Sequence, residues 1–353
     1  MGTGLRRHHT ACIRDEDLEN EPDRQVNIVI PAAGQGTRLR PHTHTLPKVM
    51  LPVAGRPIIG HILADLQSLD PREVRLVVGY RGETLEAYVG EAFPEMPVRI
   101  VWQKDQLGLG HAVLQGLVEG EREPVLVVLG DTVFDVDYRA FVASGENVLG
   151  VRPVPDPERF GIVELDDAGE RVLKLVEKPA EPRTNLALIG LYYVADGDRL
   201  RSAIASLVAD DTRTRGEYQL TDALQRMIEA GTAFVPFKLG NWFDCGKPET
   251  LLDTNRALLD RRAGEVPPEF DDVRIVPPVA IGPNCTIERA VVGPHVTLGR
   301  DAVVQEAVVR DSIIGDGATV RGCVLERSIV GPGASMEAPA RSVNLGEGSQ
   351  VTC

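Results

Sequence analysis

The chain has 353 residues, 43% hydrophobic and 25% charged, a balance typical of a folded globular protein with room for two domains. Its 38 basic and 52 acidic residues give a net charge of −14, which argues against nucleic acid or an anionic membrane as the main partner. The five cysteines form no Cys-x-x-Cys pair, and no apolar run is long enough to span a membrane, so we expect a cytoplasmic protein with reduced thiols. Residues 1–24 are polar and lack the apolar core of a signal peptide, so we expect a disordered tail.

The first strong pattern is a strand followed by a glycine turn and two cations. The apolar run Asn27–Ile30 predicts a buried strand, and the turn after it contains Gly34 and Gly36. Glycines let the backbone bend sharply there and come close to a ligand. Arg38 and Lys48 follow with no carboxylate between them. Exposed backbone amides next to unpaired positive charge favour binding of a phosphate ester.

Two other glycine motifs for phosphate binding do not fit this turn. A dinucleotide fingerprint requires a third glycine where this chain has Leu39, and a P-loop requires a Gly-Lys-Ser/Thr tripeptide that does not follow. A glycine turn after a strand is by itself ordinary turn chemistry. The phosphate interpretation therefore depends on the accompanying Thr37-Arg38-Leu39 and Pro47-Lys48.

From Gln25 to Leu259, β-rich runs alternate with segments of helical spacing, which predicts an α/β fold with a Rossmann-like, mostly parallel sheet and helices on both faces. Ligands of such sheets bind beyond the carboxyl ends of the strands, where the Gly34–Arg38 loop would lie. The expected strands are Asn27–Ile30, Val74–Val78, Val98–Trp102, Val125–Leu129, Val148–Val151, Gly161–Glu164, Val172–Glu177 and Leu188–Val194, and the expected helices are Ile58–Leu69, Thr84–Val89 and Ala112–Glu119.

The sequence pattern changes after the Pro-rich linker Val266–Phe270. Apolar residues now recur at intervals of six, often followed by glycine: Ile275, Ile281, Ile287; Val292, Leu298, Val304; Val308, Ile314, Val320; Val324, Val330 and Met336. A coil with three short faces has this period, because each inward residue stacks on the coil below. The set resembles the hexapeptide repeats of left-handed β-helices. We therefore expect an α/β domain over 25–262 and a left-handed β-helix over 268–353.

Later segments place polar residues where predicted strands end. Gln103 and Asp131 each follow a strand, Glu177 and Lys178 close another, and Asp244 stands before Cys-Gly. A carboxylate at the carboxyl end of a buried strand is well placed to hold a metal against phosphates. Two carboxylates with phosphate oxygens and water make a typical Mg²⁺ shell.

Together, the loop with its two cations and these later segments resemble the signature of the sugar-1-phosphate nucleotidyltransferases. The resemblance covers residues 25 to about 350 and is nearest to the long glucose-1-phosphate thymidylyltransferases, which join such a domain to a left-handed β-helix. It implies transfer of a nucleotidyl group from dTTP or UTP to a sugar 1-phosphate, with glucose 1-phosphate expected, and release of pyrophosphate. No general base is needed, because the attacking phosphate oxygen is already an anion.

The resemblance also implies a role for each site residue. It places the nucleotide on Ala33, Gly34, Gly36, Thr37, Gln103 and Gly108, with Gln103 on the base edge; the sugar phosphate on Gly161, Glu177, Lys178, Tyr192 and Arg215; Mg²⁺ on Asp131 and Asp244; Arg38 on the leaving phosphates; and Lys48 and Lys178 on the attacking phosphate. We expect His111 to be a helix residue near this pocket and not a catalytic base.

Several alternatives stay open. Leu107–Val113 also resembles bacterial UTP–glucose-1-phosphate uridylyltransferases, and an apolar pocket separates UTP from dTTP by only about 1–3 kcal/mol. A non-catalytic relative, serving as a regulatory or assembly subunit, would be expected to lose part of the cationic and metal-binding set that this chain keeps. The β-helix predicts a homo-oligomer. Some relatives carry acetyltransferase activity on this β-helix, but His295 lacks a matching context, so we predict no second reaction.

Overall fold

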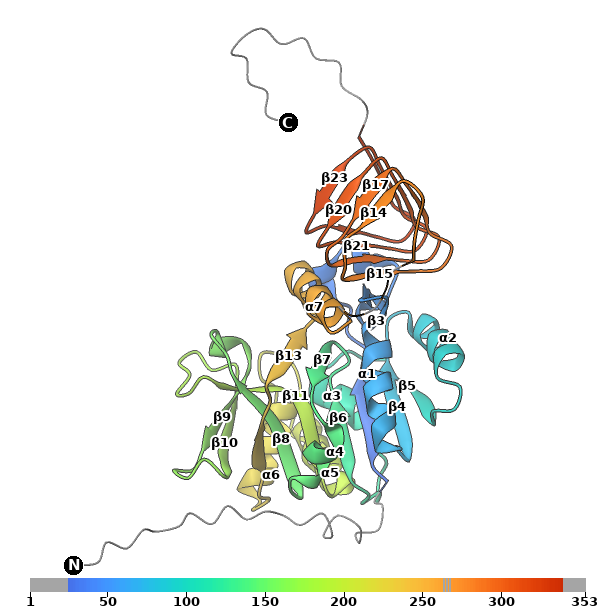
Figure 1. Ribbon diagram of the computed structural model, residues 1–353. Helices are drawn as coiled ribbons and strands as arrows, with labels where there is room; N and C mark the ends of the chain where they lie inside the picture. Colours follow the sequence, from blue (N-terminus) through green and yellow to red (C-terminus); the bar gives the residue numbers. More distant parts are fainter. Residues whose placement is uncertain (1–24, 263, 265, 267, 339–353) are drawn as a thin grey trace, which may run out of the picture.

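The computed structural model describes residues 25–262, 264, 266 and 268–338. The predicted tail at 1–24 and the last part of the predicted β-helix, 339–353, lie outside the described residues. Figure 1 shows an α/β body joined through helix α7 (Pro248–Asp260) to a triangular coil of short strands. No helix in the described part of the chain has the length and apolarity needed to cross a membrane.

The α/β body is built on one large sheet with strand order β10-β9-β11-β6-β1-β4-β5; β8 also pairs with β11, and β12 pairs with β8. Its strands are β1 (Asn27–Pro31), β4 (Glu73–Val78), β5 (Val98–Trp102), β6 (Val125–Val128), β8 (Asn147–Pro153), β9 (Gly161–Leu165), β10 (Val172–Glu177), β11 (Leu186–Val194) and β12 (Val235–Lys238). The predicted Rossmann-like fold is confirmed, and each predicted strand is present.

The sheet is more mixed than the sequence predicts. Strands β6, β1, β4 and β5 are parallel, whereas β11 runs antiparallel to β6, β8 and β9, and β9 runs antiparallel to β10. Parallel neighbours need a crossover of about a dozen residues or more, whereas shorter links allow antiparallel neighbours. The link from β9 to β10 is of this shorter kind, and these two strands are antiparallel neighbours.

Both faces of the sheet are covered, and the β1 sequence explains why. Ile28 and Ile30 belong to one core, with helices α1 (Ile58–Leu66), α2 (Gly82–Ala92) and α4 (Tyr138–Ala143). Val29 belongs to a second core, with α3 (Leu109–Gly116), α5 (Gly197–Ala209) and α6 (Leu220–Glu229). Successive strand residues point to opposite faces, so an uninterrupted apolar strand is stable only when helices cover both faces.

The helix predictions are right in position and differ at their ends. The helix expected at Ile58–Leu69 ends at Leu66 and continues as a short 3-10 turn, while α2 is longer than expected at both ends. Helix α3 begins at Leu109 and ends at Gly116, three residues earlier than expected at each end.

Beyond α7 the chain forms three parallel four-stranded sheets, β14-β17-β20-β23, β15-β18-β21-β24 and β16-β19-β22-β25, which confirms the predicted left-handed β-helix. The strands are β14 (Val273–Ile275), β15 (Val279–Ile281), β16 (Thr286–Glu288), β17 (Ala290–Val292), β18 (Val296–Leu298), β19 (Val303–Gln305), β20 (Val308–Arg310), β21 (Ile313–Ile314), β22 (Thr319–Arg321), β23 (Val324–Glu326), β24 (Ile329–Val330) and β25 (Ser335–Glu337).

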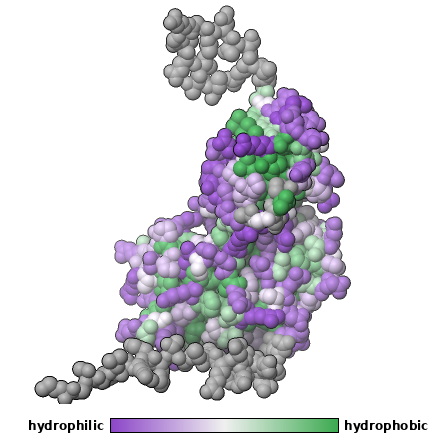
Figure 2. All heavy atoms as spheres, viewed as in Figure 1, coloured by the Kyte–Doolittle hydropathy of each residue, from purple (hydrophilic) through white to green (hydrophobic). Residues whose placement is uncertain are grey.

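Two of the predicted inward positions in this coil are wrong. Val309 is fully buried in place of Val308, and Leu325 replaces Val324, which is 68% exposed. Val309 pairs with Leu325, so this coil takes 16 residues, whereas Ile275 pairs with Val292 after 17. Three intervals of six would need about 18 residues, so the six-residue spacing is shortened at one corner of the 17-residue coil and at two corners of the 16-residue coil. Figure 2 shows that hydrophobic residues gather on the coil face that carries β14, β17, β20 and β23.

Helix α7 joins the coil to the α/β body through a buried asparagine. The Oδ1 of Asn255 accepts hydrogen bonds from the Ala54 N–H (2.8 Å) and the Thr297 hydroxyl (2.6 Å), and its Nδ2 donates to the carbonyl of His295 (3.2 Å). Asn255 and Thr297 are each only 1% exposed. One side chain thus satisfies groups from both parts of the chain.

Candidate active site

The predicted phosphate loop follows β1, and its two glycines have different surroundings. Gly36 has a φ of +60°, and a Cβ there would lie 3.0 Å from carbons of Lys48 and Thr43. The Thr43 hydroxyl donates to the Gly36 carbonyl (2.9 Å), which holds this turn in place. A Cβ on Gly34 would meet nothing within 4 Å, because this glycine faces open space. Gly36 is therefore required for the conformation of the turn, and Gly34 leaves the space beside the turn free of a side chain.

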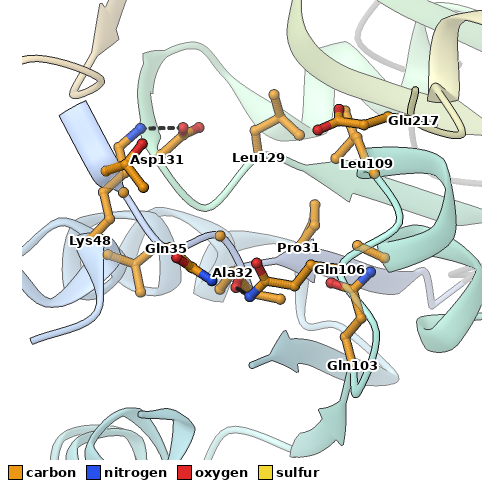
Figure 3. A pocket seen from close by; sticks show the side chains of 17 residues that line it. Pro31, Ala32, Gln35, Lys48, Gln103, Gln106, Leu109, Leu129, Asp131 and Glu217 are labelled. Carbon is orange, nitrogen blue, oxygen red and sulfur yellow. Dashed lines mark hydrogen bonds and ion pairs between the residues drawn. The ribbon is translucent and has the colours of Figure 1, made fainter. Parts of the chain in front are cut away.

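A cavity of about 600 Å³ lies over this loop at the carboxyl end of β1. Of the predicted residues, it is lined by Ala33, Gly34, Gly36, Thr37, Lys48, Gln103, Gly108 and Asp131. Figure 3 shows Lys48 and Asp131 at one end of the cavity and Gln103 at the other. The cavity thus separates a charged end, suited to phosphates, from an end with a neutral amide.

The wall between these ends contains residues for which the sequence predicted no site role, among them Gln35, Gln106, Leu109 and Leu129. Glu217, from the same segment as the predicted Arg215, also lines this first cavity. The Gln106 Nε2 donates to the carbonyl of Ala33 (2.9 Å), so the segment after β5 is tied to the phosphate loop. Gln106 lies between the predicted Gln103 and Gly108, and only its place in that segment could have suggested it.

Gly108 packs against the segment that carries Glu217. Its φ is +115°, and a Cβ would lie 2.8 Å from the carbonyl oxygen of Tyr218. The Tyr218 N–H donates to the carbonyl of Leu107 (2.9 Å). This close backbone contact leaves no room for a side chain at the start of α3.

A second cavity of about 630 Å³ adjoins the first, and Leu129 and Asp131 line both. The predicted residues in it are Arg38, Asp131, Lys178, Arg215 and Asp244, joined by Glu158, Arg159, Phe160 and Trp242. Four of these side chains are cationic, which suits an anionic ligand. The exposed Arg38 lies in this cavity and is not part of the lining of the first.

The predicted sugar-phosphate residues surround Glu177, whose side chain is 7% exposed. Its Oε1 lies 2.8 Å from the Lys178 ammonium, and its Oε2 accepts a hydrogen bond from the Thr221 hydroxyl (2.6 Å). A Cβ on Gly161 would come within 2.8 Å of that hydroxyl oxygen. The Arg215 guanidinium donates to the backbone carbonyl of Lys178 (2.9 Å). These contacts fix the cations at the wall of the second cavity.

Tyr192 does not line either cavity. It is 5% exposed and packs in the second core of the body. Burial raises the pKa of its hydroxyl, and the charge of Glu177 raises it further. The structure therefore places Tyr192 in the core near Glu177, and Glu177 and Gly161 are likewise absent from the lining of either cavity.

The two predicted metal ligands are brought together by a small ribbon, β7 (Thr132–Asp135) paired with β13 (Asn241–Asp244), which the sequence did not predict. Asp244 pairs with Thr132 in this register and so lies beside Asp131. Burial raises the pKa of the Asp244 carboxyl, and the neighbouring charge of Asp131 raises it further. Asp131 also forms an ion pair with Lys48.

This pair of repelling carboxylates fits a divalent cation. No cluster of three or more His, Cys, Asp or Glu suited to a metal occurs in the part of the chain that the structure describes. A cation at Asp131 and Asp244 would take its other ligands from a substrate and from water, as Mg²⁺ commonly does.

Comparison with known proteins identifies the family. The family model described as nucleotidyl transferase matches residues 27–261. The chain belongs to this family. Glucose-1-phosphate thymidylyltransferase from Streptomyces griseus is 32% identical over 322 residues, which cover 84% of this chain and 89% of that protein. The low-salt glycan biosynthesis nucleotidyltransferase Agl11 from Haloferax volcanii is 32% identical over 337 residues, which cover 83% of this chain and 93% of that protein.

A solved structure supports the same family. UDP-glucose pyrophosphorylase complexed with UDP-glucose is similar with a TM-score of 0.58 and 25% identity, over 67% of this chain and all of that one. In this nucleotidyl transferase, the matched residues 27–261 include both cavities. The coil follows the matched region and lines neither cavity.

Proposed function

We propose that this nucleotidyl transferase transfers a nucleotidyl group from a pyrimidine nucleoside triphosphate, dTTP or UTP, to a sugar 1-phosphate, with glucose 1-phosphate as the expected sugar. The observation that carries the proposal is the junction of the two cavities at Asp131. A reaction between two anionic substrates needs two adjoining sites that each compensate negative charge. The names of the thymidylyltransferase and UDP-glucose pyrophosphorylase relatives support these substrates.

In this proposal the base lies at Gln103, and the triphosphate extends along the glycine loop toward Asp131. The sugar phosphate occupies the second cavity, held by Lys178 and Arg215. Its phosphate oxygen forms a bond to the α-phosphorus, the bond from that phosphorus to the bridging oxygen breaks, and pyrophosphate leaves with the electron pair. Arg38 stabilises the charge that develops where the two sets of phosphates meet.

Asp131 and Asp244 would hold the divalent cation, which we expect to be Mg²⁺. When bound, the cation supplies neutralisation and orientation of phosphate oxygens. Its binding to Asp131 would also release the Lys48 ammonium from the ion pair seen here. The released Lys48 can then contact a phosphate, so binding of the cation would make Lys48 available to the substrate.

The test is pyrophosphate release by the purified protein across a panel of nucleoside triphosphates and sugar 1-phosphates with Mg²⁺. We expect turnover with dTTP or UTP together with glucose 1-phosphate, and much less with purine nucleotides. The relative rates with dTTP and UTP establish which is preferred. Absence of turnover with every pair would favour the alternative, a non-catalytic regulatory or assembly subunit.

We also propose that the protein is a homo-oligomer that assembles through its coil. Val291, Val308 and Val324 pair in register on the outer side of neighbouring strands and form an apolar row there. Large apolar side chains gathered on a surface are typical of contact sites between proteins. Light scattering should give a mass above one chain for the parent and a lower mass for Val324→Lys. A monomeric parent would contradict this part of the proposal.

A further inference from the structure

Gln103, the amide at the neutral end of the first cavity, contacts a histidine that the proposed reaction does not use. Its Nε2 lies 2.9 Å from Nδ1 of His111, in the first turns of α3. The Nε2 of Gln115 lies 3.3 Å from the other nitrogen of the same imidazole. Gln103 is 6% exposed and lines the cavity, whereas His111 is not part of that lining. His111 can therefore act on a ligand only through Gln103.

The imidazole decides which end of the Gln103 amide turns toward it. A neutral histidine with its lone pair on Nδ1 accepts a hydrogen bond from the amide N–H. The carbonyl oxygen of Gln103 is then available to a ligand. A protonated histidine carries a hydrogen on both nitrogens and attracts the carbonyl oxygen instead, which leaves only the amide N–H groups for the ligand.

These two orientations suit different pyrimidines. Uracil and thymine carry an N–H at ring position N3, which needs an acceptor, whereas the N3 of cytosine is itself an acceptor. Two acceptors that face each other in a buried site leave both without a hydrogen bond, which disfavours binding. A freely turning amide could serve either base, but a fixed one selects between them.

We propose that His111 is a positioning residue that fixes the Gln103 amide with its carbonyl toward the base, so that the site accepts uracil or thymine and rejects cytosine. This inference rests on the proposed function, because it requires that Gln103 meets the base. It assigns the selection of the base to the contact between Gln103 and His111, a residue that does not itself line the cavity.

The surroundings of His111 keep the selective state at neutral pH. Burial lowers the pKa of the imidazole, and the charge and backbone carbonyl of Asp105 oppose this shift only in part. The other side chains hydrogen-bonded to the ring are the neutral amides of Gln103 and Gln115. The imidazole therefore stays neutral down to acidic pH, and preference for uracil should fall only as the pH drops through its lowered pKa.

The experiment compares the parent with His111→Leu and His111→Gln, using UTP and CTP with glucose 1-phosphate and Mg²⁺. We expect His111→Leu to lower the ratio of kcat/KM for UTP to that for CTP by about tenfold, through a higher KM for UTP at little-changed kcat. His111→Gln keeps an acceptor for the Gln103 N–H and should restore the ratio. The parent's ratio should hold at neutral pH and fall as the pH drops through the lowered pKa of His111, and that of His111→Gln should not fall there.

Equilibrium dialysis of UTP and CTP without the sugar phosphate gives a second reading that does not depend on turnover. Unchanged selectivity in His111→Leu, or the same acidic loss of selectivity in His111→Gln as in the parent, would overturn the role of His111 while the proposed function stands. If the parent binds neither nucleotide and releases no pyrophosphate, both proposals fail. Should His111→Leu unfold, the pH profiles of the parent and His111→Gln still decide.

Discussion

Gly108 gives the sharpest test of how the first cavity is built. Its φ of +115° and ψ of 175° lie in a backbone region that is essentially limited to glycine. In Gly108→Ala the new Cβ would lie 2.8 Å from the carbonyl oxygen and 2.9 Å from the amide nitrogen of Tyr218. Both of these atoms are held by backbone hydrogen bonds, to Gly110 and Leu107, so they cannot turn aside as a flexible side chain would.

Two costs add in this substitution. The strained backbone costs about 1–3 kcal/mol, and overpacking against a fixed neighbour costs about 1–3 kcal/mol more. We therefore expect the free energy of unfolding to fall by about 2–6 kcal/mol. At about 2–4 °C for each kcal/mol in a domain of this size, the Tm should fall by about 4–24 °C.

Thermal unfolding followed by circular dichroism measures this change. Gly34→Ala is the matched control, because a Cβ there meets nothing within 4 Å. The control should keep the parent's Tm, yet it should raise the KM for the nucleotide, since its Cβ would stand beside the cavity that we assign to the triphosphate. A Gly108→Ala protein that unfolds at the parent's temperature would refute the reasoning.

Three further predictions concern the charged site and the junction with the coil. Arg38→Ala should lower turnover by about 10²–10³-fold. Its Tm should not change, because Arg38 is exposed. The control Arg40→Ala changes a residue outside both cavities and should keep activity, so equal rates in the two variants would contradict the role of Arg38. Asp244→Asn should abolish Mg²⁺-dependent turnover yet raise the Tm of the metal-free protein at neutral pH. Burial and Asp131 raise the folded-state pKa of Asp244, so its charge destabilises the fold above that pKa, and the Tm gain should vanish as the pH falls through it. Asn255→Leu would leave the Ala54 N–H and the Thr297 hydroxyl without their acceptor. The free energy of unfolding should fall by about 1–3 kcal/mol for each of these buried donors, seen as a lower Tm and faster proteolysis at the junction. Proteolysis at the parent's rate would contradict the bridging role of Asn255.

The sequence pattern predicted those parts of the fold that depend on short stretches of neighbouring residues. The apolar run Ile28–Ile30 marks a strand buried on both faces, and the glycine loop after it lies at the carboxyl edge of the sheet, as expected. The six-residue repeat indicates the β-helix, but it fails where Val309 and Leu325 replace the expected residues. A shortened corner changes which residue points inward without changing the apolar composition, so the pattern alone cannot locate it.

The remaining features depend on contacts between distant segments. The β7–β13 ribbon pairs Thr132 with Asp244, and neither short segment is distinctive before the fold brings them together. Tyr192 lies in a strand that is apolar throughout, so alternation gives no sign of which side chains face a cavity. The contact between Gln103 and His111 depends on how α3 packs beside β5, which is a tertiary property.

The most direct test of the central claim is product analysis after incubation with Mg²⁺, glucose 1-phosphate and either UTP or dTTP. The two adjoining cavities predict a nucleoside diphosphate glucose and pyrophosphate in equal amounts, formed only when both substrates are present. Pyrophosphate released at the same rate without glucose 1-phosphate, or no nucleotide sugar with either triphosphate, would contradict the account.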